Sequence, residues 1–227
     1  MNYNLLNLML LVTVSLVLLY SATNSICFAD ENDEQAFAYS THIDISKNLK
    51  AFDKRNLHKF ARIITDLLSV TRNIVAKNQE LINRDPTTGN YYFKGFVPAV
   101  VGSDIANDFS LLTGWKLKQT SLKVRNPSNA PDGWEEKVLK SFETMEGTKA
   151  VSFGEIVEIN GQTTYRYMKP IYVNKPCLEC HGDKRKLKPA IKKFMTKRYP
   201  HDQAYGYKEG DIRGGISIII PIDQNNY

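Results

Sequence analysis

Apolar residues recur at helical spacing in the first half of the chain. No Pro or Gly occurs between Ile45 and Ile82, and the pattern predicts one long helix over this range. Its expected buried stripe consists of Leu57, Phe60, Ile64, Leu67, Ile74 and Leu81. A second helix is predicted from Pro98 to Leu112, with Gly114 as its C-terminal stop. Two helices therefore precede the first predicted strand.

The second half changes to the two-residue period of β-structure. Four stretches are typical of strands: residues 115–122, 151–159, 163–173 and 215–222. Between two of them lies Asn160-Gly161, the strongest short hairpin signal. Further helices are predicted over 132–145 and 189–198, and the proline-containing stretch 123–131 is predicted to be a fixed loop. Because strands do not alternate with helices as in βαβ units, the fold class is α+β with three or four antiparallel strands.

The N-terminal stretch carries no charged side chain before Asp30. Residues 5–20 are almost wholly apolar, but such a run is shorter than the roughly twenty residues needed to span a bilayer. The small residues Cys27 and Ala29 occupy the positions that a signal peptidase recognises before its cleavage site. We therefore predict a cleaved signal peptide over residues 1–29, a linker over 30–44 and one domain over 45–227, with no stable membrane insertion after cleavage. An uncleaved N-terminal anchor is the alternative.

The formal net charge is +6, and basic residues gather in one short region. They are Lys184, Arg185, Lys186, Lys188, Lys192, Lys193, Lys197 and Arg198. This region is either a docking face for an acidic redox partner or a solvated helix face. Nucleic acid is excluded as a partner, since the chain is predicted to be exported and has no aromatic-interleaved basic motif.

Candidate chemistry is concentrated in Cys177-Leu178-Glu179-Cys180-His181. Cys-x-x-Cys-His is the attachment motif of c-type haem, in which Cys177 and Cys180 form thioethers with the porphyrin and His181 ligates the iron. Haem attachment of this kind takes place outside the cytoplasm in bacteria, which agrees with the predicted signal peptide. We therefore expect one covalently bound haem c in a periplasmic or otherwise extracytoplasmic protein.

Two other interpretations of the cysteine pair remain open. A structural zinc site requires four ligands, and no further Cys remains after residue 29. A thioredoxin-type redox pair belongs at the start of a helix in a βαβ unit, whereas this pair follows a predicted strand and Pro176. Both interpretations fit the pattern less well than haem attachment.

Several blocks of the sequence resemble one family. They are residues 120–135, 166–171, 177–182 and 207–217, and their order and spacing agree over about residues 50–222. On these blocks the chain is similar to the Tll0287-like family, also called DUF3365, of exported haem proteins. The resemblance implies a PAS-like antiparallel sheet with a long N-terminal helix and flanking helices, and one c-type haem held against the sheet. Some relatives carry the domain at the N-terminus of transmembrane chemoreceptors or kinases, which implies a role in sensing.

The sequence does not identify the sixth ligand of the iron. Some family members place a cysteine in the long helix, but the matching residues 70–76 contain none. Met168, on a predicted central strand, and His58, on the long helix, are the candidates, and a site that is empty or filled by water is the alternative. His201, in a turn, is predicted to be a surface residue.

Arg125 is the candidate ligand of the haem propionates, because a guanidinium group matches a carboxylate in two-point geometry. A structural role in the fixed loop is the alternative. The sequence thus predicts a haem-based module that senses or binds a diatomic gas or responds to redox state. An electron-transfer cytochrome that docks a redox partner protein is the alternative. No distal acid or base can be assigned, so we expect a binding module rather than an enzyme.

Overall fold

The computed structural model describes residues 54–145 and 150–222. The predicted signal peptide (1–29), the linker (30–44) and residues 45–53 of the predicted domain lie outside the described residues. Within the described ranges, no helix combines the length and the apolar character needed to cross a bilayer.

Four antiparallel strands form one sheet in the order β1-β4-β3-β2. They are β1 (Lys116–Thr120), β2 (Phe153–Ile159), β3 (Gln162–Tyr172) and β4 (Ile212–Pro221). A two-residue turn joins β2 to β3, with Asn160 at φ 53° and Gly161 at φ 77°, as a hairpin turn of the Asn-Gly type requires. The last strand inserts between β1 and β3, so the sheet is completed only by the end of the described chain. The predicted α+β class is confirmed.

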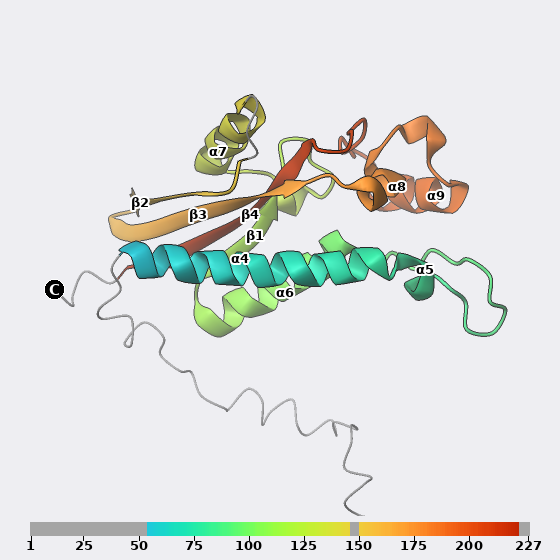
Figure 1. Cartoon of the computed structure of the whole chain (residues 1–227), viewed down its shortest axis with the longest axis horizontal. Coiled ribbons are helices and arrows are strands. Elements are labelled where there is room, and N and C mark those ends of the chain that lie inside the picture. The colour runs from blue at the N-terminus through green and yellow to red at the C-terminus, as the bar shows by residue number, and fades with distance from the viewer. Residues whose placement is uncertain (1–53, 146–149, 223–227) are drawn as a thin grey trace, which may run out of the picture. The chain divides into compact units, whose positions relative to one another are not determined.

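Helices cover both faces of the sheet (Figure 1). The long α4 (Lys54–Lys77) and α6 (Pro98–Thr113) lie on one face, and α7 (Gly133–Thr144) lies on the other. The shorter elements are α5 (Gln79–Ile82), η1 (Pro127–Asn129), η2 (Lys175–Cys177), α8 (Leu178–His181), η3 (Lys184–Lys186) and α9 (Pro189–Arg198). Except for α5, these elements lie in the segment before α7 or in the segment between β3 and β4. Helices α8 and α9 lie together at one end of the sheet (Figure 1).

Helix ends follow local chemistry. Gly114 ends α6 in the left-handed conformation at φ 71°, and its N–H donates to the Ser110 carbonyl. At the start of α7, the Asp132 side chain accepts from the Glu135 N–H while the Glu135 side chain accepts from the Asp132 N–H. This reciprocal capping box satisfies two N–H groups that the helix itself leaves without partners.

Two separate clusters of buried side chains hold the layers together. On the α4 and α6 face, Tyr165, Tyr167 and Ile218 are at most 1% exposed and pack against the helices. On the α7 face, Leu139 and Met168 are equally buried. The two sets alternate along the strands because successive side chains of a strand point to opposite faces.

The predicted stripe of the long helix is largely wrong. Leu57 is buried and Ile64 is half-buried, but Phe60, Leu67, Ile74 and Leu81 are all exposed. The residues that face the sheet are Leu57, Ala61, Thr65, Leu68 and Val75. The helix has apolar residues on two faces, and the sequence pattern alone did not distinguish which of them packs on the sheet.

Candidate functional site

The Cys-x-x-Cys-His motif lies immediately after β3. The Val173 N–H donates to the Asp211 carbonyl at 2.8 Å, which ties the end of β3 to the approach to β4. Next come η2 and α8, so Cys177 and Cys180 lie on consecutive short helical turns. Both thiols are free and partly exposed. The motif therefore has the compact helical form that brings its three side chains toward one side.

The His181 ring has a defined tautomer. Its Nδ1 lies 2.9 Å from the Ala204 carbonyl oxygen, which can only accept, so Nδ1 carries the proton. Nε2 is therefore an acceptor, and it receives only a long hydrogen bond of 3.4 Å from Arg213 Nε. Burial, with the positive charges of Arg213 and Arg125, lowers the pKa of His181 well below its ordinary value. The imidazole is neutral, with the lone pair of Nε2 available to a metal.

The segment before β4 holds the motif from the other side. The Tyr207 N–H donates to the His181 carbonyl at 3.1 Å, and the Gly206 N–H donates to the Gly182 carbonyl at 2.9 Å. Gly182 itself follows α8 closely, because a Cβ atom there would lie 2.7 Å from the Leu178 carbonyl oxygen. A glycine directly after the histidine thus lets the chain turn back toward this segment.

Arg125 joins three parts of the site. Its Nε donates to Asp202 Oδ2 at 2.7 Å, and the two side chains are 10% and 3% exposed. Its Nη2 also donates to the Cys180 carbonyl at 2.7 Å and to the Ala204 carbonyl at 3.3 Å. Arg125 therefore supports the same carbonyl that orients His181. These contacts give it the structural role that the sequence left as an alternative, and its predicted contact with propionates stays a prediction.

A cavity of about 790 Å³ adjoins the motif. Both cysteines and His181 line it, together with side chains from α4, from the end of the sheet and from α9. Representative lining residues of these elements are Arg72 and Ala76 of α4, Ile171 of β3, Gly214 of β4, and Ile191 and Met195 of α9. The volume falls in the range of about 300–1,000 Å³ that small-molecule and cofactor sites occupy.

Two half-buried arginines line the cavity without a carboxylate partner among the described residues. Arg72 Nη1 donates to the Pro98 carbonyl at 3.2 Å, and burial lowers the pKa of Arg72 to about 10. Arg213 contacts Ser121, the Lys123 carbonyl, His181 and the Tyr207 ring, and burial likewise lowers its pKa. Their remaining donors and their charge favour an anionic group in the cavity.

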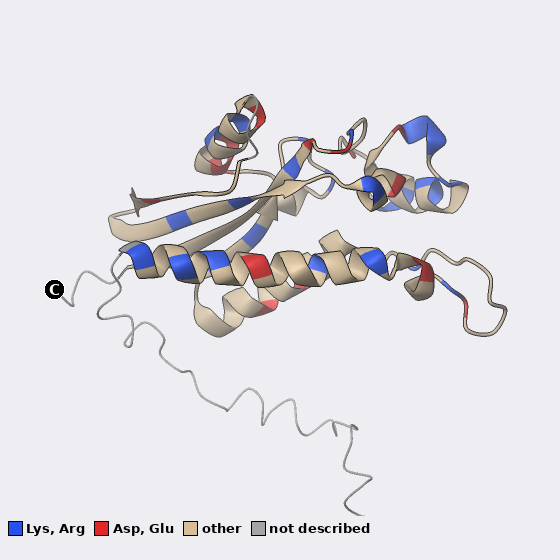
Figure 2. Cartoon of the chain, viewed as in Figure 1, with Lys and Arg blue, Asp and Glu red and all other residues tan. Residues whose placement is uncertain are grey.

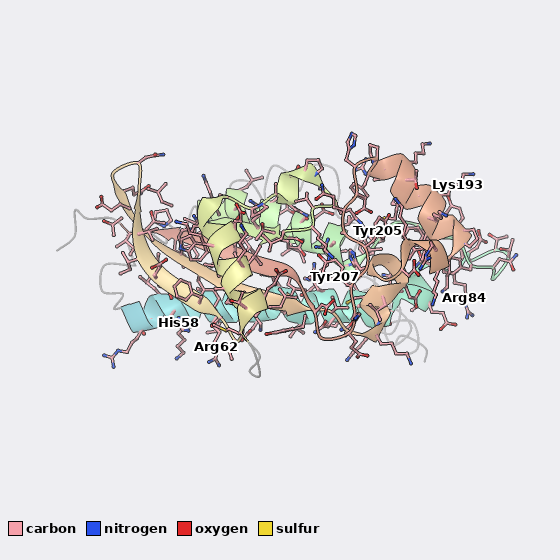
Figure 3. All side chains as sticks on the ribbon, turned by 90° about the horizontal axis from the view of Figure 1, so that it is seen from above. His58, Arg62, Arg84, Lys193, Tyr205 and Tyr207 are labelled. Atoms are coloured by element: carbon pink, nitrogen blue, oxygen red, sulfur yellow. The ribbon has the colours of Figure 1, made fainter. Side chains whose placement is uncertain are left out.

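The two candidates for the sixth ligand do not reach the cavity. Met168 is fully buried on the α7 face of the sheet, because strand alternation directs it away from the α4 face. His58 bonds Tyr165 Oη at 2.9 Å and lies toward the N-terminal end of α4. It is far from Tyr207, whose N–H donates to the His181 carbonyl (Figure 3). Neither residue lines the cavity, so this placement does not support either of them as the sixth ligand. His201 is exposed, as predicted.

Sequence reasoning missed two residues of the cavity. Met195 is 2% exposed, packs in the cluster that includes Cys180, and lines the cavity. Its spacing of four residues from Ile191 in a basic helix is the signal that could have identified it. Arg72 gave no such signal, because an arginine on a charged helix is ordinary.

The other interpretations of the cysteine pair lose support. Among residues 54–145 and 150–222, no three His, Cys, Asp or Glu side chains group as a metal site requires. Burial raises the pKa of Cys180 to about 11, which opposes the thiolate that a redox-active pair needs. The sheet is antiparallel throughout, so the described fold contains no βαβ unit.

Comparison with known proteins agrees with the sequence resemblance. The Tll0287-like family model matches residues 53–221. A solved structure, described as the crystal structure of the cyanobacterial heme-protein Tll0287, is 27% identical in sequence. The match covers 77% of this chain and 99% of that chain, with a TM-score of 0.59. No curated protein matches. Because the family match spans well over half of its length, the chain belongs to the Tll0287-like family.

Proposed function

We propose that this protein is a mono-haem c-type cytochrome that works as a gas- or redox-sensing module. The observation that carries the proposal is the joint placement of Cys177, Cys180 and His181 on one cavity of about 790 Å³. In this arrangement Cys177 and Cys180 would hold the haem through thioethers, and His181 Nε2 would bind its iron. The description of the structural relative as a heme-protein supports the same cofactor.

The residues present fit a haem. The Nδ1 proton of His181 is held by the Ala204 carbonyl, which leaves Nε2 for the iron. Ligation would replace only the 3.4 Å contact from Arg213, which is at the long end of hydrogen-bond geometry. The apolar side chains of Ile171, Ile191 and Met195 suit the porphyrin faces. When bound, haem would supply reversible iron redox chemistry and the capacity to bind a small ligand at the iron.

Arg72 and Arg213 are our candidates for the two haem propionates, in place of Arg125. Each has spare guanidinium donors at the cavity and no carboxylate partner among the described residues, whereas Arg125 is engaged by Asp202. We expect Arg72→Gln and Arg213→Gln each to lower the reduction potential, because removing a nearby cation favours the more positive ferric state. Potentiometric titration measures this shift.

The matched control for this pair is Arg62→Gln. Arg62 lies on the same helix as Arg72, but its side chain is 66% exposed and contacts Asp66 on the surface (Figure 3). The reduction potential of the Arg62→Gln variant should stay at the wild-type value. Equal potentials for Arg72→Gln, Arg213→Gln and the control would exclude the two arginines as propionate partners.

Sensing is favoured over electron transfer by the α4 wall of the cavity. That wall presents Arg72 and Ala76, followed by Gln79 of α5, and none of these is a thiolate, thioether or imidazole. An iron without a strong sixth ligand binds diatomic gases reversibly. Electron transfer is the second candidate, and Met195 favours it, since its thioether lines the same cavity. Exposed basic residues on and before α9 would then face an acidic redox partner (Figure 2).

The absorption spectrum of the ferrous protein with carbon monoxide separates these two candidates. We expect a high-spin ferrous spectrum that shifts when the gas is added, and the same behaviour in Met195→Leu. Met168→Leu is the control for a buried methionine away from the cavity. A low-spin wild-type protein that ignores carbon monoxide, together with a Met195→Leu variant that binds it, would establish the electron-transfer alternative instead.

We further propose an extracytoplasmic location for the mature chain. The support comes from the uncharged residues 1–29 and from the site of thioether formation in bacteria.

A further inference from the structure

The long helix α4 carries a second apolar face that does not contact the sheet. Five large side chains on this face are exposed: Ile63 (51%), Leu67 (67%), Val70 (54%), Ile74 (56%) and, continuing into α5, Leu81 (70%). The face that packs on the sheet contains Ala61, Leu68 and Val75, on the other side of the helix. A helix at the surface of a monomer normally has a polar outer face. The outer face of α4 is instead suited to contact with another apolar surface.

The spacing of the exposed apolar residues indicates which kind of surface this face would contact. Ile63, Leu67, Val70 and Ile74 are separated by four, three and four residues, and Leu81 follows seven residues after Ile74. These steps are the a and d positions of a heptad repeat, which makes a narrow seam with a period of 3.5 residues. Such a seam matches another helix with the same repeat, and α4 itself has that repeat.

We propose that α4 pairs with α4 of a second copy in an antiparallel seam, so that the protein is a homodimer. Centring the pair between Leu67 and Val70 places each of these residues against the other in the second copy. The same register places Ile63 against Ile74 of the second copy. In the same register Lys59 lies level with Asn78 of the second copy, which brings Lys59 within one turn of Glu80 at the start of α5. The two-fold symmetry repeats this opposite-charge pair.

Charge and the width of the seam distinguish the antiparallel pair from a parallel pair and from a membrane surface. A parallel pair would set the exposed Lys77, at a d position, against its own copy, which is unfavourable. A membrane surface is a poorer occupant, because a helix that lies on a bilayer presents a broad apolar face, whereas this seam has only the width of the a and d positions. A second copy in the antiparallel sense is therefore the occupant that the sequence of α4 fits.

The seam and the cavity share the same part of α4. Arg72 lies between Val70 and Ile74 in sequence and lines the cavity, while these two neighbours belong to the seam. Pairing through the outer face therefore leaves the cavity side of the helix unchanged. The dimer does not depend on the proposed haem function, and either proposal can fail without the other.

Sedimentation equilibrium of the mature full chain tests the dimer. We expect twice the monomer mass at micromolar concentration. Leu67→Glu/Val70→Glu should raise the dimer dissociation constant by roughly 100-fold or more, because the seam would bury unpaired carboxylates. The matched control is Leu111→Glu on α6, a leucine that is 81% exposed outside the seam and whose substitution should leave the dimer intact. Far-ultraviolet circular dichroism confirms that each variant is folded.

A monomeric wild-type chain, or a dimer that survives Leu67→Glu/Val70→Glu, would overturn the proposal. The orientation has its own test. Lys59→Glu should weaken the dimer a few-fold, and Lys59→Glu/Glu80→Lys should restore it, because the charges are exchanged across the same pair. A double variant as weak as Lys59→Glu would overturn the antiparallel register. A monomeric wild type that binds anionic vesicles through this face would assign the seam to lipid and also overturn the dimer.

Discussion

Cys177→Ser/Cys180→Ser is expected to yield a folded protein that holds no covalently attached haem. Serine hydroxyl groups do not form the thioethers, and the remaining contacts of the cavity are noncovalent. Haem staining after denaturing electrophoresis should fall from strong in the wild type to background in the double variant. The fold should persist, since both thiols are partly exposed and neither forms a disulfide.

Glu179→Gln is the matched control for the serine variant. It changes the middle of the same motif, where the carboxylate makes only a 3.2 Å contact with Lys188 between side chains that are more than half exposed. Its haem stain should equal that of the wild type. Colour that survives denaturation in Cys177→Ser/Cys180→Ser would show that attachment does not use these thiols.

Arg125→Leu is expected to destabilise the protein by about 3–5 kcal/mol, because it leaves a buried carboxylate without its partner. Asp202 is only 3% exposed, and its Oδ2 lies 2.7 Å from Arg125 Nε. The same change removes a donor from the Cys180 and Ala204 carbonyls. Urea denaturation followed by circular dichroism measures the free energy of unfolding.

A surface ion pair supplies the comparison for Arg125. Lys140 and Glu136 on α7 lie 2.6 Å apart, but their side chains are 63% and 47% exposed. Lys140→Ala should therefore cost no more than about 0.5 kcal/mol. In addition, Arg125→Leu/Asp202→Leu should recover part of the loss, since no unpaired charge remains. If Arg125→Leu were as stable as Lys140→Ala, Arg125 would not support the motif as we describe.

Elements with strong local signals were predictable from the sequence. The Asn160-Gly161 turn fixed the β2–β3 hairpin because both residues accept positive φ. The α9 helix has the bounds that the pattern predicted, 189–198, and Gly114 ends α6 as expected. In each case the deciding interaction lies within a few residues along the chain.

Choices that depend on tertiary packing were not predictable in the same way. The face of α4 that contacts the sheet was assigned wrongly, because the helix has two apolar faces and only the sheet distinguishes them. Met168 was a candidate for the sixth iron ligand, but its side of β3 was fixed by the pairing with β4, which lies far away in sequence. The register between β3 and β4 cannot be derived from a single sequence.

Some residues of the candidate site could likewise be identified from the sequence, and others could not. Cys177, Cys180 and His181 were found because the motif is contiguous, and the structure places all three on one cavity. Arg72 and Met195 were missed because their elements, α4 and α9, are brought to the motif only by folding. Arg125 was identified as a site residue, but its buried partner Asp202 follows it by 77 residues, so its structural role required the fold.

Intact-protein mass spectrometry of the purified chain, after acid–acetone extraction, tests the central claim most directly. The host must have a working cytochrome c maturation system. We predict the mass of residues 30–227 plus one haem, with tandem fragmentation locating the added mass on Cys177 and Cys180. A folded protein with the mass of the unmodified polypeptide would contradict the account.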